Sequence, residues 1–97
     1  MTIEEIYKII QERQKNQPAD SYVASLFKKG NDRIVQKIGE ESIEVIIAAK
    51  NQDRNVVISE VADLWFHILV LLVASHISFE EILIELENRN KSKQTIE

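Results

Sequence analysis

Helix breakers are almost absent from this chain, and that scarcity constrains its fold more than any other feature of the sequence. Only two glycines and one proline occur in 97 residues. Apolar residues recur almost everywhere at intervals of three and four, the spacing that gathers them on one face of an α-helix. The sequence therefore predicts an all-α protein.

The boundaries of the helices are also readable. Pro18 ends the first helix, either Asp20 or Ser21 can cap the second, and Gly30 ends it. Ser78 opens a capping box with Glu81 at the start of the last helix. Neither an internal repeat nor an interdomain linker is visible, so residues 1–90 are expected to form one helical bundle before a polar tail over 91–97. The five helices are expected over about residues 3–14, 21–28, 32–49, 54–75 and 78–88.

Size and charge narrow the possible partners. A domain of 97 residues is small, so burying apolar surface against a second copy would stabilise it, and oligomerisation is expected. The net charge of −4 argues against a nucleic-acid surface, which usually shows a basic stripe. The absence of cysteine excludes disulfides and thiolate metal sites and fits a reducing compartment.

The most apolar run is VADLWFHILVLLVA, residues 61–74. It is shorter than the roughly 20 residues that a membrane span needs, and it contains Asp63 and His67, so it is expected to be a buried core helix. The first residues, MTIEEIYKII, lack the basic and apolar regions of a secretory signal. A cytoplasmic protein without a membrane partner is expected.

Acidic residues interrupt the apolar pattern at KIGEESIEVIIAAK, residues 37–50. On a helix, Glu41 and Glu44 lie about 60° apart, and Lys37 falls in the same sector. Aliphatic residues border this sector on both sides, so it is not a plain solvated face. The next helix repeats the arrangement, with Glu60, Asp63 and His67 on one stripe.

A short loop, KNQD, separates these two helices and predicts that they lie antiparallel, with ESIE facing EVAD. Four converging carboxylates raise one another's pKa and need a compensating cation. Oxygen ligands in a chain without cysteine favour Mg²⁺ or Mn²⁺. The sequence therefore predicts a divalent metal site formed by Glu41, Glu44, Glu60 and Asp63.

Other interpretations of these residues stay open. An E-x-x-E pair is common on exposed helix faces, and Lys37 could simply pair with Glu41. His67 is more typical of a hydrogen-bonded core histidine, or of a partner that holds a carboxylate, than of a metal ligand. Trp65 and Phe66 are expected in the core or in a dimer interface. Tyr22 could stack on a base, although a core position is favoured.

Three segments carry a family resemblance: SYVASLFKKGNDRIVQKIGEESIEVIIAAKNQ, ISEVADLWFHILVLL and ISFEEILIEL. Together they closely resemble the phosphoribosyl-ATP pyrophosphatases, the second enzymes of histidine biosynthesis, over about residues 3–90. The E-x-x-E and E-x-x-D pairs alone would specify only the wider all-α, MazG-like nucleoside triphosphate pyrophosphatases. The surrounding residues narrow the match.

The resemblance implies Mg²⁺-dependent hydrolysis of phosphoribosyl-ATP to phosphoribosyl-AMP and pyrophosphate, in a homodimer of intertwined helices. It implies the same metal ligands, Glu41 also serving catalysis, Glu40 as the acid that positions or activates the attacking water, and Lys37 as a phosphate contact. The cyclohydrolase of the next step is expected on a separate chain. Two alternatives remain: a house-cleaning (d)NTP pyrophosphatase, and a helical dimerisation module without catalysis.

Overall fold

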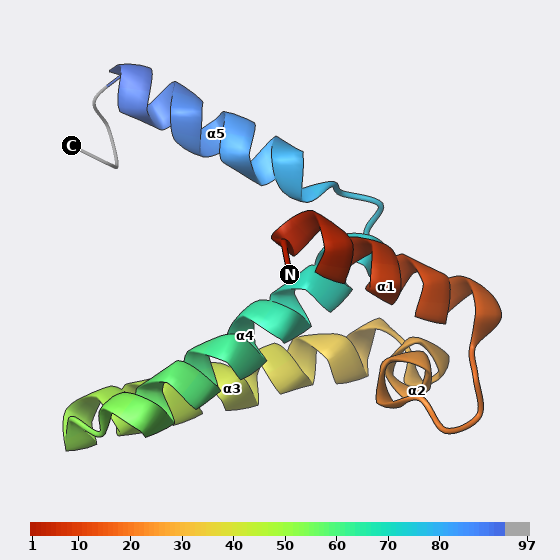
Figure 1. Cartoon of the computed structure of the whole chain (residues 1–97), viewed down its shortest axis with the longest axis horizontal. Helices are drawn as coiled ribbons and strands as arrows, with labels where there is room; N and C mark the ends of the chain where they lie inside the picture. Colours follow the sequence, from red (N-terminus) through yellow and green to blue (C-terminus); the bar gives the residue numbers. More distant parts are fainter. Residues whose placement is uncertain (93–97) are drawn as a thin grey trace.

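The computed structural model describes residues 1–92, and this part of the chain contains five α-helices and no strand (Figure 1). The predicted all-α fold is confirmed. Residues 93–97, most of the tail predicted over 91–97, lie outside the described residues, whereas 91 and 92 end the last helix. The helices are α1 (Ile3–Asn16), α2 (Tyr22–Lys29), α3 (Asn31–Asn51), α4 (Arg54–Ala74) and α5 (Phe79–Ser92).

Side-chain caps set the starts of several helices. Of the two predicted candidates, Ser21 caps α2: its side chain accepts a hydrogen bond from the Ala24 amide at 3.1 Å. The predicted box at Ser78 is also present, because the Ser78 amide donates to Glu81 Oε2 at 2.8 Å. Such bonds satisfy the amides that a helix start leaves without partners. Sequence and structure therefore agree on these boundaries to within a residue.

Helices α3 and α4 form an antiparallel hairpin and lie side by side (Figure 1). Only Gln52 and Asp53 connect them. Gln52 adopts the left-handed conformation, with φ of 56°, and its amide bonds to the Ala49 carbonyl. The Asp53 side chain then accepts from the Val56 amide and caps α4. Because the connection is so short, it sets which residues of α3 face which residues of α4.

The core lies at one end of this hairpin, where α1 packs on α4 and α2 packs on both α1 and α3. Tyr7 of α1 closes it: its hydroxyl donates to the Ile77 carbonyl at 2.8 Å, and its ring packs against Phe79. These contacts fasten the α4–α5 connection to α1. The buried residues of the core cluster are Tyr7, Ile10, Leu26, Ile34, Leu69, Val70, Leu72 and Val73.

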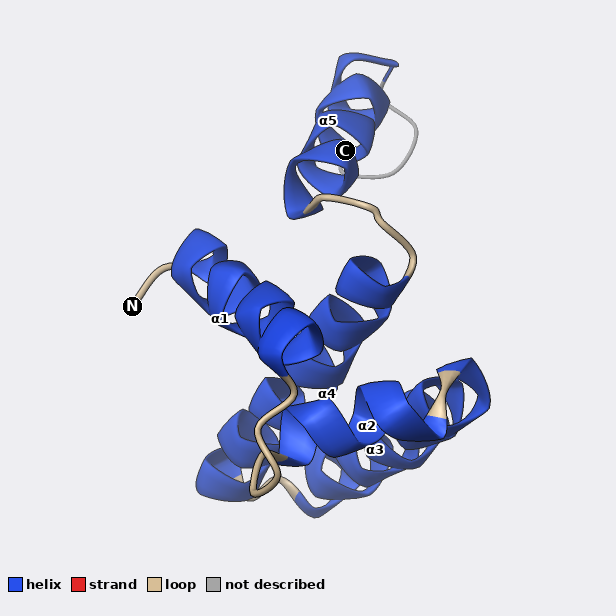
Figure 2. Ribbon diagram, turned by 90° about the vertical axis from the view of Figure 1, so that its right-hand side faces the viewer, coloured by secondary structure: helices blue, strands red, loops and turns tan. Residues whose placement is uncertain are grey.

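Helix α5 projects away from the other four helices (Figure 2). Every residue over 80–90 is exposed, including aliphatic ones such as Leu83. Between α5 and α4 runs an apolar groove, called here the α4–α5 groove. Trp65 lines it with 59% of its surface exposed, so it lies outside the core of the single chain. The groove is lined by Ile3, Trp65, Ile68, Leu69, Leu72, Phe79, Ile82, Leu83 and Leu86.

Helix α4 is long and apolar enough to cross a membrane by length and composition alone. This is weak evidence for a span, because the core helix of a soluble protein meets the same criteria. In this fold α4 packs against α3 and α1 and carries Glu60 and Asp63 in its middle.

Candidate active site

The hairpin brings three acidic side chains together. Glu41 of α3 and Glu60 and Asp63 of α4 each offer a carboxylate oxygen within 4.8 Å of the others. We call these three residues the acidic triad. The predicted facing of ESIE and EVAD is thus present, with three of the four expected ligands converging. Glu44 is exposed and lies outside the triad, one turn further along α3.

Repulsion within the triad is visible in Glu60. Partial burial raises the pKa of its carboxyl group, and the charges of Asp63, Glu44 and Glu41 raise it further. Glu44 therefore acts on the triad electrostatically although it does not converge with it. A cation placed among these oxygens would relieve the repulsion, and carboxylate oxygens are the ligands that hard divalent ions prefer. The residues present thus fit a divalent metal.

Lys37 lies at the edge of the triad. Its ammonium group bonds to Glu40 Oε2 at 3.1 Å and to Glu41 Oε1 at 3.4 Å, and only 18% of its side chain is exposed. The pairing of Lys37 with Glu41, which the sequence offered as an alternative interpretation, is present. The pKa of Lys37 is raised, first by the hydrogen bond to Glu40, so its charge persists at neutral pH. The single ammonium group of Lys37 therefore bridges Glu41 of the triad and Glu40.

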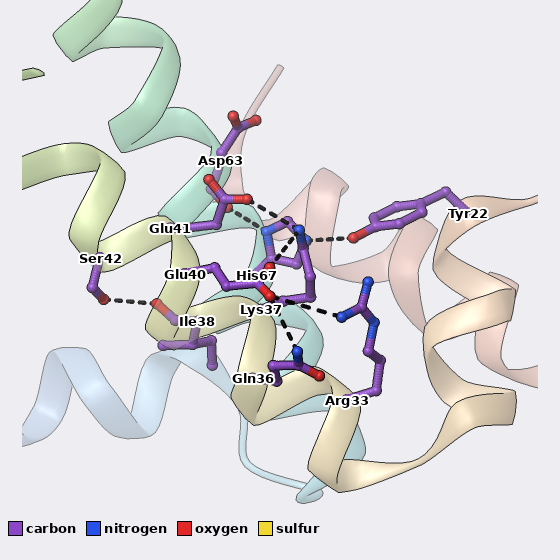
Figure 3. A network of polar contacts seen from close by, with 10 residues as sticks. All are labelled: Tyr22, Arg33, Gln36, Lys37, Ile38, Glu40, Glu41, Ser42, Asp63 and His67. Carbon is purple, nitrogen blue, oxygen red and sulfur yellow. Dashed lines mark hydrogen bonds and ion pairs between the residues drawn. The ribbon is translucent and has the colours of Figure 1, made fainter. Parts of the chain in front are cut away.

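Glu40 is in a different environment from its neighbour Glu41 (Figure 3). Its carboxylate accepts from Lys37 and from Gln36 Nε2 at 3.2 Å, and Arg33 lies 3.9 Å away. The hydrogen bond from Lys37 is the main cause of the lowered pKa of Glu40. Glu40 lies outside the triad, beside the cations Lys37 and Arg33. Its neighbour Glu41 lies with the acids of the triad.

His67 is buried and hydrogen-bonded at both ring nitrogens, as expected for a core histidine. Nδ1 lies 2.7 Å from the Asp63 carbonyl oxygen, and Nε2 lies 2.9 Å from the Tyr22 hydroxyl oxygen. Tyr22 is not in the core, contrary to the favoured prediction, since 49% of its surface is exposed. The two side chains are 45 residues apart in sequence and come from different helices, so no local spacing pattern could pair them.

An all-α hairpin with acids facing across it fits the class of all-α nucleotide pyrophosphohydrolases. Residues 3–90 match the family described as phosphoribosyl-ATP pyrophosphohydrolase, and the chain belongs to that family. It is therefore an enzyme of the hydrolase class.

Curated relatives agree with this assignment, and each is called phosphoribosyl-ATP pyrophosphatase. One from Lacticaseibacillus casei is 48% identical over 96 residues, which cover 99% of this chain and 87% of the relative. One from Methanocella arvoryzae is 48% identical over 91 residues, covering 92% and 96%. One from Clostridium novyi is 45% identical over 89 residues, covering 92% and 81%.

Proposed function

We propose that the protein hydrolyses phosphoribosyl-ATP to phosphoribosyl-AMP and pyrophosphate, a step of histidine biosynthesis. The relatives carry this substrate in their names, and the match spans residues 3–90. The observation that carries the proposal is the acidic triad beside Lys37, since a triphosphate is bound through both a cation and a basic side chain.

We propose that the triad, with Glu44 beside it, holds Mg²⁺, or Mn²⁺ in its place. All four side chains offer only oxygen donors. Partial burial and then the charges of Asp63, Glu44 and Glu41 raise the pKa of Glu60, and a bound cation would offset both. When bound, the ion would neutralise charge on the phosphate oxygens and lower the pKa of a bound water.

The chain's own residues have distinct roles in this proposal. Lys37 contacts a phosphate, and its partial burial strengthens that interaction. Glu41 serves both as metal ligand and as catalytic residue. The oxygen of a water molecule attacks one phosphorus of the triphosphate, its proton passes to a carboxylate, and pyrophosphate leaves. Glu40 is proposed to position or activate that water. Its lowered pKa keeps it ionised at neutral pH, as a proton acceptor must be, although it also makes Glu40 a weaker base.

A second copy of the chain is proposed to cover the α4–α5 groove. Exposed residues such as Trp65, Ile82 and Leu83 lie together along this groove, and a contiguous exposed apolar patch is typical of an interaction surface. A homodimer would bury this surface and give α5 the packing that it lacks within one chain. The dimer is proposed to act in the cytoplasm.

The activity is tested by measuring pyrophosphate release from phosphoribosyl-ATP and from a panel of dNTPs, each with millimolar Mg²⁺ and with chelator. We expect release from phosphoribosyl-ATP that requires the metal. Preferential hydrolysis of a dNTP would instead identify a house-cleaning enzyme. Absence of release from any nucleotide would overturn the proposal.

Metal binding is tested separately by thermal unfolding. Mg²⁺ at 100 times its dissociation constant should stabilise the fold by about 2.7 kcal/mol. The Glu41→Ala/Glu44→Ala variant should lose this shift. The Glu4→Ala/Glu87→Ala variant, which removes two exposed glutamates from helix surface pairs, should keep it. An equal shift in both variants would contradict the site.

The role of Glu40 is tested with Glu40→Gln. The amide keeps the shape of the side chain but cannot accept a proton, so turnover should be abolished while the Mg²⁺-induced stabilisation persists. Unchanged turnover would remove Glu40 from this role.

A further inference from the structure

The Tyr22 hydroxyl has a structural partner but no part in the mechanism above. Tyr22 opens α2, and its ring is half-exposed while its hydroxyl meets the buried His67. Figure 3 shows Tyr22 pointing from α2 toward His67, on the side of the site where Lys37 and Glu41 meet. Tyr22 also lies close enough to Lys37 for its ionised form to be among the causes that raise the pKa of Lys37, after the hydrogen bond to Glu40.

The hydrogen bonds of His67 determine which way the hydroxyl proton points. The Asp63 carbonyl oxygen, 2.7 Å from Nδ1, can only accept, so Nδ1 carries the ring proton. In the neutral ring Nε2 is then an acceptor. The Tyr22 hydroxyl, 2.9 Å from Nε2, must therefore donate its single proton to the histidine. The phenol oxygen has only lone pairs left for other partners.

A hydroxyl whose proton is already engaged cannot bind a phosphate oxygen, which also only accepts. It favours a donor instead. Lys37 is one nearby donor, but its ammonium group already bonds to Glu40 and Glu41. The donors that a nucleotide carries next to its phosphates are sugar hydroxyls. A nucleotide held by Lys37 and the triad would place such a hydroxyl close to this side of the site.

We propose that Tyr22, with its hydroxyl oriented by His67, is a substrate-binding residue that accepts a hydrogen bond from a ribose hydroxyl of the nucleotide. The proposal rests on the proposed function, because it presumes a nucleotide triphosphate held by Lys37 and the triad. It assigns specificity for a sugar hydroxyl to a residue outside the acidic motifs.

The first test compares the wild type with Tyr22→Phe using phosphoribosyl-ATP. Removing the phenol oxygen should raise KM about tenfold, the worth of one hydrogen bond, with the effect in KM rather than in kcat. Tyr7→Phe is the matched control, because the Tyr7 hydroxyl likewise donates to a buried acceptor at 2.8 Å but lies outside the site. It should leave KM unchanged. Equal KM values for Tyr22→Phe and the wild type would overturn the proposal.

The second test identifies the hydroxyl. Deoxy analogues of phosphoribosyl-ATP, each lacking one hydroxyl of either ribose, are assayed with both proteins. The analogue that lacks the contacted hydroxyl should have a raised KM in the wild type and no further rise in Tyr22→Phe. A similar additional rise in Tyr22→Phe for every analogue would show that the Tyr22–His67 bond only fastens α2 to α4, and would overturn the proposal.

A third measurement does not depend on turnover or on metal. Binding of phosphoribosyl-AMP, which retains both riboses, is measured by calorimetry in chelator. We expect Tyr22→Phe to weaken it about tenfold and Tyr7→Phe to leave it unchanged. Equal affinity for wild type and Tyr22→Phe would count against Tyr22 alone. Absence of wild-type turnover with phosphoribosyl-ATP would instead overturn both the proposed function and this inference.

Discussion

The apolar residues of α4 have opposite surroundings in its two halves. In the carboxyl-terminal half, Leu69, Val70, Leu72 and Val73 are buried in the core. In the amino-terminal half, Val56 is 42% exposed and Ile58 is 54% exposed. Helices α1 and α2 cover only the first of these halves, and the acidic triad lies in the second (Figure 1). The chain thus completes its core at one end of the hairpin and leaves the site at the end that its own helices do not enclose.

The largest expected effect contrasts one isoleucine from each environment. Ile10, which is 1% exposed, packs in the closed core, whereas Ile58 is 54% exposed. Ile10→Ala should lower the free energy of unfolding by about 2–5 kcal/mol, because it leaves a cavity. Ile58→Ala should change it by less than about 0.5 kcal/mol when measured by urea titration at low protein concentration. Equal losses of unfolding free energy in the two variants would contradict the difference between the two environments.

The next largest effect tests whether a second copy of the chain covers the α4–α5 groove. Trp65→Lys places a charge in the α4–α5 groove and should weaken self-association by about 2 kcal/mol, or roughly 30-fold in Kd. Sedimentation over a concentration series measures this directly. Glu12→Lys, on the exposed face of α1, is the control and should leave association unchanged. Monomeric wild type at all concentrations would contradict the proposed dimer.

A smaller effect concerns the junction between the core and α5. Tyr7→Phe removes the hydrogen bond to the Ile77 carbonyl and should cost about 1 kcal/mol. The pKa of Tyr7 is raised above 10.0, first by burial and then by Glu80 and Glu81. A raised pKa favours the neutral phenol, so this stabilisation is complete below pH 10 and is lost as pH rises through the raised value. Urea titrations at neutral and alkaline pH should therefore show the gap between wild type and variant closing at high pH. A gap that stays constant would contradict this account.

The smallest expected effect concerns the repulsion among the acids in the amino-terminal half of α4. In chelator at neutral pH, Glu60→Gln should raise stability slightly, because it removes a charge repelled by Asp63, Glu44 and Glu41. The raised pKa of Glu60 means that its ionisation disfavours the folded state, so the gain should disappear as pH falls through that value towards 4.5. With Mg²⁺ present the same variant should be less stabilised than the wild type. Thermal unfolding with and without metal measures both signs, and a metal-free loss would contradict the repulsion.

The helices themselves were predictable because caps and apolar spacing are local. The predicted third helix, about 32–49, differs from Asn31–Asn51 by only a few residues. The projection of α5 was not predictable. An apolar stripe shows which face of a helix avoids water, but it does not show whether the covering surface belongs to the same chain.

The site also has parts that could be predicted from the sequence and parts that could not. The facing of Glu41 with Glu60 and Asp63 follows from helical spacing and a short loop, both of which are readable in sequence. The Tyr22–His67 contact was not readable, because it depends on how α2 docks against α4. Glu40 and Glu41 are the same residue type and adjacent in sequence, but their surroundings differ. The rotation of α3 about its axis relative to α4 places Glu41 in the triad and Glu40 beside the cations.

The two-residue connection at Gln52 and Asp53 has a consequence for how the length of this chain can vary. A residue added to or removed from it would change the rotation and the register of α4 relative to α3, because a connection of two residues has little slack. Glu60 and Asp63 would then point away from Glu41, although none of the three had been replaced. Insertions and deletions here should therefore inactivate the enzyme. In the connection over 75–78, which Tyr7 fastens to α1 through the Ile77 carbonyl, they should lower stability but leave the acids facing one another. The activity depends on the number of residues between its acids as much as on the acids themselves.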